Sequence, residues 1–592
     1  MREMLQGPCL VRSDRTVLLE CGHPNAEAAR ELLLQIAELV KTPPMYHTYR
    51  ITPLTLWNAA SLGMDAGTAV NRLEDLCGGS MPAGMSRWMK ETMLKFGTLT
   101  LQAAVGDGRL VLTAGTTALL DKLEAEEITS TCGFTRSGSL EMTGPAEERG
   151  RLKQGLAAAG YPVRDQAGCQ EGQPLDVRWR GEDVSFRLRD YQREAAEALS
   201  ASGESGVIVL PCGSGKTVVG IAVMEGLKCE TLILTSNTTS VMQWTEELRS
   251  RTTLASEDIG EYTGERRSVR PVTVATYQML THRSTKEGGF QHMKLFKERN
   301  WGLIVYDEVH LLPAPVFRAT AGIQATRRVG LTATLVREDG REEDVFSLIG
   351  PKRYDCAWRM LEEEGWIAKV RCFEVAVPLQ RKLRETYLYT GIREKFRLAS
   401  TNPVKTEAVA AILKRHSGAP VLIIGQYLDQ LEVLADAVSA PLLTGRTPQK
   451  ERMKLYQEFN EGKIRVLVLS KVANFAVNLP DASVLIEVSG AFGSRQEEAQ
   501  RLGRILRPKS GDNTAFFYTV VTDDSREKEF ALRRRLFLLE QGYAYSEIRY
   551  ETGGLMNPFP VEDEGFDEDK DGDFNVDGVM IQREAMERNE TL

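Results

Sequence analysis

Short, almost wholly apolar runs, each closed by turn residues, recur between about residue 206 and residue 521. The first series reads GVIVL, TLILT, VTVAT, LIVYDE and RRVGLTAT, with helical patterns between the runs. A second series reads PVLIIG, RVLVLS, SVLIEV and TAFFYTVV. Strands of a parallel sheet are covered on both faces, so they read as continuous apolar runs rather than as alternating ones. The pattern therefore predicts two successive α/β domains, at 187–375 and 376–550.

Two regions precede these domains and one follows them. Residues 1–135 mix two expected strands, Arg15–Glu20 and Arg109–Thr113, with two expected amphipathic helices, Glu27–Val40 and Asp65–Leu76. Residues 136–186 are polar and Gly-rich, which predicts a connector with one helix, Ala146–Ala159. Residues 551–592 are acidic and have little to bury, which predicts a disordered tail. A chain of 592 residues is long enough for this many units.

The net charge of −8 is unusual for a nucleic-acid-binding protein until it is located. Residues 562–577 contain nine acids and one base, so this stretch alone carries −8 and the remaining chain is neutral. A neutral body can hold a basic groove, because the local field attracts phosphate rather than the total charge. The charge balance is therefore compatible with a nucleic-acid partner.

The cysteines and the hydropathy pattern indicate the cellular compartment of the protein. Its nine cysteines are scattered and form no C-x-x-C pair, which argues against a zinc site or a disulfide framework. No window approaches the roughly 18 apolar residues of a membrane span. The start, MREMLQGPCLVRSD, lacks the features of a secretory signal. We expect a cytoplasmic protein with no membrane partner.

The segment VIVLPCGSGKT is predicted to bind the phosphates of ATP. It is an apolar strand that runs into a Gly-rich turn and then into a helix, so backbone N–H groups and the helix N-terminus can surround a phosphate. Lys216 is expected to reach the terminal phosphates, and the Thr217 hydroxyl can bind Mg²⁺. The alternative is a Gly-rich turn with a chance lysine. The residues expected to line this site are Leu210, Pro211, Cys212, Gly213, Ser214, Gly215, Lys216 and Thr217, with Leu210 standing where the motif G-x-x-x-x-G-K-[ST] has its first glycine.

The segment LIVYDEVH ends a second apolar run in two acids. A buried strand that ends there places both carboxylates at the carboxyl edge of the sheet, where ligands bind in open α/β folds. Asp307 is expected to hold Mg²⁺, and Glu308 is expected to orient and deprotonate the attacking water. His310 would connect this site to the neighbouring motifs. The alternative is an exposed acidic turn.

The segment QEEAQRLGRILRPK contains the pattern Q-x-x-G-R-x-x-R, at Gln500, Gly503, Arg504 and Arg507. Two arginines three residues apart lie on one helical face, and each has a planar fork suited to phosphate oxygens. From the second α/β domain they would complete the ATP site and stabilise charge in the transition state. A solvated basic helix is the alternative.

D-E-x-H, G-S-G-K-T and Q-x-x-G-R-x-x-R together resemble superfamily 2 helicases, and further residues narrow the resemblance to the XPB family. GLTATLVREDGREEDVFSLIGPKRY resembles the T-A-T, R-E-D and I-G-P-K elements of that family. The run from Ser470, SKVANFAVNLPDASVLIEVSG, resembles its motif V, although Asn478 stands where many members have Asp. RLRDYQREA resembles its adenine-reading Q segment, with Gln192 as the adenine contact. QGPCLVRSDRTVLLECGHP and HTYRITPLTLWNA resemble the N-terminal domain of bacterial members.

The resemblance implies a fold and two further elements that contact nucleic acid. The fold is two tandem RecA-like motor domains, preceded by an α+β N-terminal domain and a small connector domain with a damage-recognition-like element. Arg337, Glu338 and Asp339 would help to separate strands; a salt-bridged loop is the alternative. A thumb-like segment, 380–399, would grip DNA, because it interleaves cations with Tyr387, Tyr389 and Phe396. A solvated amphipathic helix is the alternative there, and the expected contacts are Arg381, Lys382, Arg384, Arg393, Lys395 and Arg397.

The predicted function is that of an ATP- and Mg²⁺-dependent DNA helicase that moves 3′→5′ in repair or transcription-coupled processing. Its expected partner is duplex DNA with a single-stranded region, together with a nuclease or repair protein. One alternative is a duplex translocase of a defence or restriction system; this chain shows no nuclease motif of its own. Another is an ATP-gated DNA clamp, although a scaffold need not keep Lys216, Glu308 and Arg507. RNA is an alternative track, because D-E-x-H motors occur on both nucleic acids.

Overall fold

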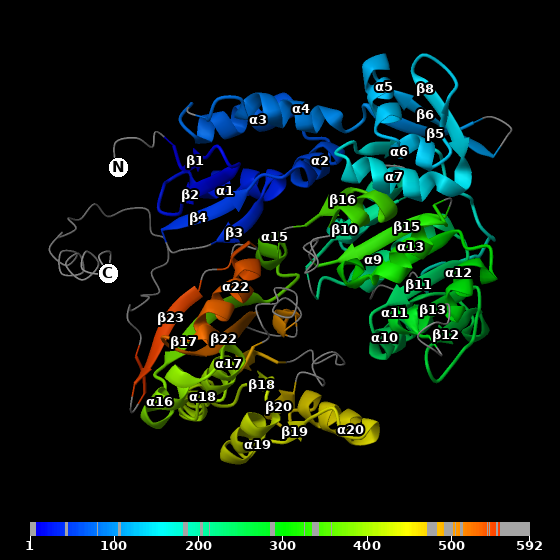
Figure 1. The fold of residues 1–592 in the computed structure, drawn as a ribbon. Helices are drawn as coiled ribbons and strands as arrows, with labels where there is room; N and C mark the ends of the chain where they lie inside the picture. Colours follow the sequence, from blue (N-terminus) through cyan, green and yellow to red (C-terminus); the bar gives the residue numbers. More distant parts are fainter. Residues whose placement is uncertain are drawn as a thin grey trace.

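A computed structural model describes most of the chain between residues 7 and 556. The described residues are 7–41, 45–79, 81–104, 108–180, 187–201, 205–211, 213–283, 290–324, 326–333, 342–356, 358–470, 482–490, 501–503, 505–509, 513–540, 543, 545–551 and 554–556. They form four sheets with helices packed against them (Figure 1). Within these residues no helix combines the length and apolarity needed to cross a bilayer.

The first sheet is antiparallel and belongs to the N-terminal region. Its strand order is β1-β2-β4-β3, with β1 Cys9–Val11, β2 Thr16–Glu20, β3 Glu38–Lys41 and β4 Tyr46–Arg50. Its helices are α1 Ala26–Ile36, α2 Pro53–Ser61, α3 Ala66–Leu76 and α4 Met85–Lys95. The helix predicted over 27–40 ends at Ile36, because Ala37 is extended and buried Leu39 pairs with Tyr49 in the sheet.

The second sheet follows directly, in the order β7-β8-β6-β5-β9. Its strands are β5 Leu99–Ala103, β6 Arg109–Ala114, β7 Thr135–Arg136, β8 Glu141–Pro145 and β9 Val163–Asp165. Its helices are α5 Thr117–Ala125, α6 Ile128–Thr131, the 3₁₀ turn η1 Ala146–Glu148 and α7 Arg149–Ala158. The predicted division at residue 135 therefore runs through one sheet, because the strands beyond it are short and half polar and read as a connector.

The third sheet is parallel, in the order β12-β13-β11-β14-β15-β10-β16. Its strands are β10 Gly206–Val209, β11 Thr231–Thr235, β12 Ile259–Tyr262, β13 Val272–Thr276, β14 Leu303–Asp307, β15 Arg327–Thr332 and β16 Lys352–Asp355. The longer elements around it are α8 Asp190–Ala201, α9 Lys216–Leu227, α10 Thr238–Arg251, α11 Tyr277–Thr281 and α13 Ala314–Ala321. The shorter ones are η2 Ser256–Asp258, η3 Gln291–Lys294, α12 Leu295–Glu298, η4 Val309–Leu311, α14 Glu342–Asp344 and η5 Val345–Ile349. The five apolar runs are all strands of this sheet, which confirms the first predicted α/β fold.

The fourth sheet has the order β19-β20-β18-β21-β22-β17-β23-β24 and is parallel except for the β23–β24 hairpin. Its strands are β17 Lys369–Val377, β18 Val421–Gly425, β19 Leu442–Leu443, β20 Val466–Ser470, β21 Val484–Glu487, β22 Thr514–Thr522, β23 Tyr545–Glu551 and β24 Gly554–Met556. Its helices are α15 Trp358–Glu363, α16 Arg381–Tyr389, α17 Ile392–Ser400, α18 Val404–Arg415, α19 Leu428–Ala437, α20 Gln449–Asn460 and α22 Arg526–Glu540. The four runs of the second series are strands here too. The tail predicted from residue 551 begins inside the β23–β24 hairpin, and its residues after 556 lie outside the described residues.

The N-terminal region contacts both parallel-sheet domains (Figure 1). Strand β3 lies against α22, and Leu539 packs on the N-terminal core. On the other side, Asn58 Oδ1 accepts a hydrogen bond of 3.2 Å from the backbone N–H of Lys352, and the Trp57 and Phe346 rings lie 6.0 Å apart. The region thus contacts one parallel-sheet domain through α22 and the other through β16 and η5.

Candidate nucleotide-binding site and nucleic-acid interface

The glycine loop between β10 and α9 has the backbone shape that its sequence predicts. Gly213 and Gly215 have φ of +80° and +85°, in the left-handed region that favours glycine. A Cβ on Gly215 would lie 2.7 Å from Gln192 Nε2, so a side chain there would displace that amide. Helix α9 begins at Lys216, which directs its first N–H groups at the loop. The loop can therefore surround an anion.

The residues that precede the glycines in the sequence differ in what they contact. Leu210 is fully buried in the core, and its N–H donates to the Thr332 carbonyl at 2.9 Å, so it supports the loop from behind. Pro211 is buried, and its carbonyl accepts from the Ser214 hydroxyl at 2.6 Å. Cys212 lies outside the described residues.

The Q segment holds the loop from the side. The Gln192 amide donates to the Ser214 carbonyl at 2.9 Å, and its oxygen accepts from the Arg189 N–H at 3.1 Å. The Tyr191 hydroxyl donates to the same carbonyl at 2.6 Å. In the same segment, the Arg189 guanidinium lies 4.6 Å from the centre of the Trp366 ring. Trp366 was not predicted from the sequence, because it is distant in the chain and belongs to no motif.

The acidic pair lies at the end of β14, beside the loop. Lys216 Nζ lies 3.6 Å from Glu308 Oε1, and both side chains are largely buried. Glu308 has a φ of +52°, a strained value for a residue with a side chain, of the kind that is found at functional sites. Burial and the neighbouring Glu308 raise the pKa of Asp307 to about 6. Groups of both charges thus converge where the phosphates of a nucleotide would lie.

One hydrogen bond to this pair and one beside it could not be read from the motifs. The Trp244 indole N–H donates to Asp307 Oδ2 at 2.9 Å, and His310 Nδ1 lies 2.7 Å from the Thr332 hydroxyl. His310 Nδ1 also lies 3.5 Å from Glu308 Oε2. His310 therefore joins Glu308 to the T-A-T motif at the end of β15. Trp244 belongs to none of the motifs, and the packing of α10 on β13 and α9 places its indole beside Asp307.

The second parallel-sheet domain meets the glycine loop. A Cβ on Gly213 would lie 3.5 Å from Leu506 Cβ and 4.0 Å from the Gly503 carbonyl oxygen. Arg507 follows Leu506 directly, whereas Gln500 and Arg504 lie outside the described residues. The segment that carries the second half of the predicted site is thus placed against the first half.

The predicted nucleic-acid residues divide between described and undescribed parts. Arg337, Glu338 and Asp339 lie outside the described residues. The thumb-like segment forms the helices α16 and α17, and its cations Arg381, Lys382, Arg384, Arg393 and Arg397 are exposed, with Lys395 half-buried. Arg397 pairs with Asp429 at 3.0 Å. A cationic helical hairpin is thus presented to solvent on the second domain.

Two parallel-sheet domains that meet at a phosphate loop define a helicase-type ATPase. The comparisons with known proteins agree. Residues 361–590 match the family model described as ERCC3/RAD25/XPB C-terminal helicase. Residues 9–138 match a helicase conserved C-terminal domain, and residues 185–337 match the res subunit of type III restriction enzymes.

Curated relatives extend this likeness to almost the whole chain. A protein of Kineococcus radiotolerans named DNA 3′-5′ helicase XPB is 48% identical, over 92% of this chain and 96% of the relative. One of Mycobacterium tuberculosis with the same name is 47% identical, over 94% of this chain and 100% of the relative. A Saccharomyces cerevisiae protein named general transcription and DNA repair factor IIH helicase/translocase subunit XPB/SSL2 is 30% identical, over 91% of this chain and 72% of the relative. The chain belongs to the XPB family of DNA helicases.

Proposed function

We propose that this protein is an ATP-dependent DNA helicase that moves 3′→5′ and acts in DNA repair or in transcription-coupled processing. One observation carries the proposal: the glycine loop of the first motor domain lies against Gly503 and Leu506 of the second. A nucleotide held at that contact touches both domains, so its binding and hydrolysis change how they meet. Opening and closing of this contact would move the domains along one strand.

The roles of the residues follow from their placement. Lys216 would hold the terminal phosphates. Its Nζ lies 3.6 Å from Glu308 Oε1, at the end of the glycine loop. Glu308 would orient the attacking water and take its proton. Arg504 and Arg507, with Gln500, would approach the phosphates from the second domain. Gln192 would keep the loop in shape and contact adenine.

The oxygen donors of the site suit Mg²⁺. The Thr217 hydroxyl lies in the first turn of α9, directly after the loop, and Asp307 ends β14, so the site offers both a hydroxyl and a carboxylate. Hydroxyl and carboxylate oxygens are the ligands that Mg²⁺ prefers beside phosphates. Bound there, Mg²⁺ would neutralise charge on the phosphate oxygens. Trp244 would then orient the Asp307 carboxylate through its hydrogen bond at Oδ2.

The track would be bound by exposed cations rather than by the buried site. The cations of α16 and α17 face solvent, where phosphate charge can reach them. The partner is then DNA with a single-stranded region. A cytoplasmic location and a repair partner complete the proposal.

Stimulation of ATP hydrolysis by nucleic acid tests the proposal. We expect single-stranded DNA to raise phosphate release by the full-length protein well above its basal rate, and RNA of the same sequence to raise it less. The variant Lys216→Ala should weaken both ATP binding and turnover, which assigns the activity to this site. Equal stimulation by RNA, or no stimulation by either, would contradict a DNA track.

A further inference from the structure

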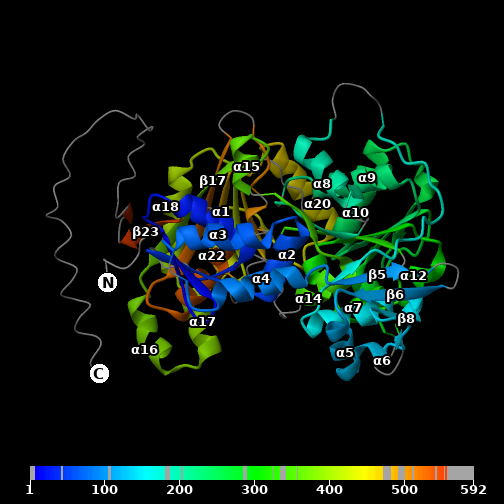
Figure 2. The ribbon, with the colours of Figure 1, turned by 90° about the horizontal axis from the view of Figure 1, so that it is seen from above.

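The tip of the α16–α17 hairpin exposes large apolar side chains. Tyr389 is 91% exposed, and its neighbours Leu388 and Ile392 are 67% and 64% exposed. Helix α16 has no buried residue, so the hairpin stands out from the second motor domain (Figure 2). Three exposed apolar side chains at one turn cost solvation free energy, and such groups commonly mark a binding site.

The three aromatics of the hairpin differ in what they contact. Phe396 is buried, with its ring 5.2 Å from that of Phe530. The Tyr387 hydroxyl accepts from the Arg526 N–H at 2.9 Å, and Lys395 Nζ lies 5.6 Å from the Tyr387 ring. In the described part of the chain, Tyr389 makes neither a side-chain hydrogen bond nor a ring contact. Tyr389 is therefore the aromatic whose face is open to a ligand.

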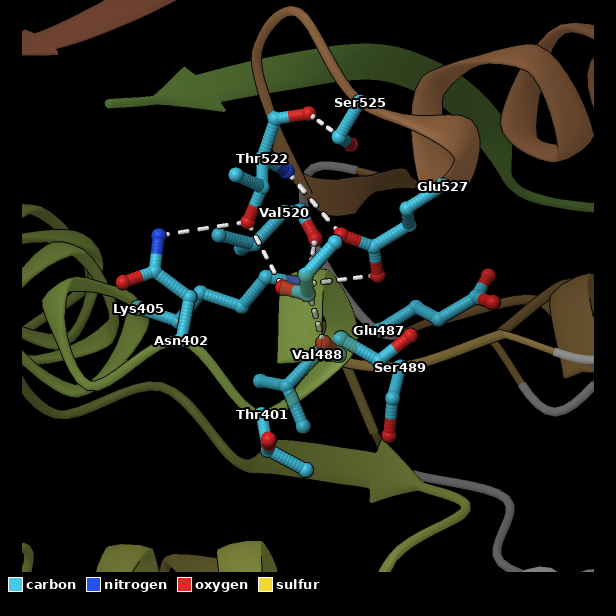
Figure 3. A network of polar contacts seen from close by, with 12 residues as sticks. Thr401, Asn402, Lys405, Glu487, Val488, Ser489, Val520, Thr522, Ser525 and Glu527 are labelled. Atoms are coloured by element: carbon cyan, nitrogen blue, oxygen red, sulfur yellow. Dashed lines mark hydrogen bonds and ion pairs between the residues drawn. The ribbon is translucent and has the colours of Figure 1, made fainter. Parts of the chain in front are cut away.

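The root of the hairpin is fixed at both ends. Asn402 Nδ2 donates to the Pro378 carbonyl, just before α16, at 2.9 Å and to the Thr522 hydroxyl at 3.2 Å. The Thr522 hydroxyl donates to the Ala399 carbonyl at the end of α17, at 2.7 Å. The entry and exit of the hairpin are thus tied to the end of β22, and Figure 3 shows the contact of Asn402 with Thr522.

A buried ion pair secures this root. Lys405 Nζ lies 2.6 Å from Glu527 Oε1 and donates to the carbonyls of Val488 and Val520, at 2.8 and 2.9 Å (Figure 3). Glu527 Oε2 in turn accepts from the Thr522 N–H at 3.0 Å. Because all these groups are buried and paired, a force on the tip is passed to the motor sheet rather than lost in a mobile root.

Residues at the same sheet edge also contact the segment that meets the glycine loop. Glu487, next to Val488, pairs with Arg501 at 2.5 Å, and Arg501 lies in the segment whose Leu506 faces Gly213. The hairpin is thus connected through buried contacts to the element that meets the phosphate loop.

The chemistry of the hairpin matches single-stranded DNA. Its cations flank the tip and suit phosphates, while Tyr389, Leu388 and Ile392 offer an apolar surface that suits the face of an unpaired base. A duplex end offers fewer open faces, because its bases are stacked on one another. Cations beside an apolar tip also suit an anionic membrane, but the connection of the root to the motor sheet favours the track.

We infer that Tyr389 stacks on a base of the single-stranded DNA that the motor tracks, with Leu388 and Ile392 covering the edges of that base. This inference rests on the proposed function. It assigns the cations of the hairpin to the backbone and the tip to the bases, so the tip lets the protein distinguish unpaired from paired DNA.

Binding to DNA with and without bases tests the inference in the full-length protein. Tyr389→Ser should bind a single-stranded oligonucleotide about tenfold more weakly than the parent, as a lost base–aromatic stack predicts. Tyr389→Trp should bind like the parent. On an abasic oligonucleotide of the same length, the parent and Tyr389→Ser should bind equally. Val433→Ser is the matched control, because Val433 is an exposed apolar residue on α19 of the same domain, and it should bind like the parent.

Three results would overturn the inference. One is unchanged binding of Tyr389→Ser to the normal oligonucleotide. Another is an equal loss on both oligonucleotides, which would place Tyr389 on the backbone. The third is a loss of binding to vesicles of anionic phospholipid with DNA binding intact. A parent protein that binds no DNA would instead contradict the proposed function, so the two failures are distinguishable.

Discussion

Each of the two motor sheets has a Lys–Glu pair at its carboxyl edge, and the two pairs differ in distance and in exposure to solvent. At the first edge, Lys216 and Glu308 lie 3.6 Å apart and keep 11% and 19% of their side-chain surface exposed. At the second edge, Lys405 and Glu527 lie 2.6 Å apart with 1% exposed each. Burial lowers the pKa of Lys405, whereas its partner Glu527 opposes that shift.

The difference shows how one architecture yields a binding site and an anchor. An ammonium group has three donors, and Lys405 uses all three, on Glu527, Val488 and Val520. No donor is left for a ligand, so the cluster can only hold the chain together. The Lys216–Glu308 pair is longer, and both of its side chains remain partly open to solvent, so a nucleotide can approach it. Access from solvent, rather than the position on the sheet, separates the two roles.

Glu308→Gln tests the first edge and should have the largest effect. Turnover of ATP should fall by at least roughly a hundredfold, because the water loses its base, while ATP binding and thermal stability stay close to those of the parent. Phosphate release and equilibrium nucleotide binding measure the two quantities on the same preparation. Hydrolysis at the parent rate would show that another group activates the water.

Replacement of Arg337, Glu338 and Asp339 by alanine tests whether these residues, which follow the T-A-T motif, are needed for strand separation. Basal ATPase should stay within a few-fold of the parent, since no phosphate or Mg²⁺ ligand is removed. Unwinding should fall much further, because less of each ATP cycle is directed at base pairs, whose stacking is worth about 1.4 kcal/mol per step. If the triplet is a structural salt bridge, then thermal stability, ATPase and unwinding should decline together.

Lys405→Met tests the second edge, where the effect should be on stability. The change leaves Glu527 buried without its cation, which should cost about 3–5 kcal/mol. Arg381→Met on exposed α16 is the matched control and should shift stability by less than about 0.5 kcal/mol. Denaturant unfolding of both variants gives the comparison. Equal midpoints for the two would mean that the cluster does not anchor the fold.

Most of the motor fold could be predicted because its central strands are covered on both faces. The strands at the sheet edges could not: β16 reads KRYD and is only half-buried, and β19 has two residues. The phosphate loop and the acidic pair were predictable because each is contiguous in sequence. The contact of Gly213 with Leu506 and the pair Lys405–Glu527 join residues far apart in the chain, so no local pattern indicates them.

Deletion of residues 561–592 should have the smallest effect. The segment contains twelve acids and three bases, a net charge of −9, and no predicted motif. ATPase should be unchanged, while non-specific DNA binding should strengthen, most visibly at low salt. Titration of DNA binding against salt measures this. A truncated protein that fails to fold would instead show that the tail packs against the body.

Strand displacement on tailed duplexes tests the central claim most directly. The full-length protein should separate a DNA duplex with a 3′ single-stranded tail in the presence of ATP and Mg²⁺. It should leave the same duplex with a 5′ tail largely intact, and Glu308→Gln should separate neither. Displacement of the 5′-tailed duplex alone, or displacement by Glu308→Gln at the parent rate, would contradict a 3′→5′ DNA motor driven by hydrolysis at this site.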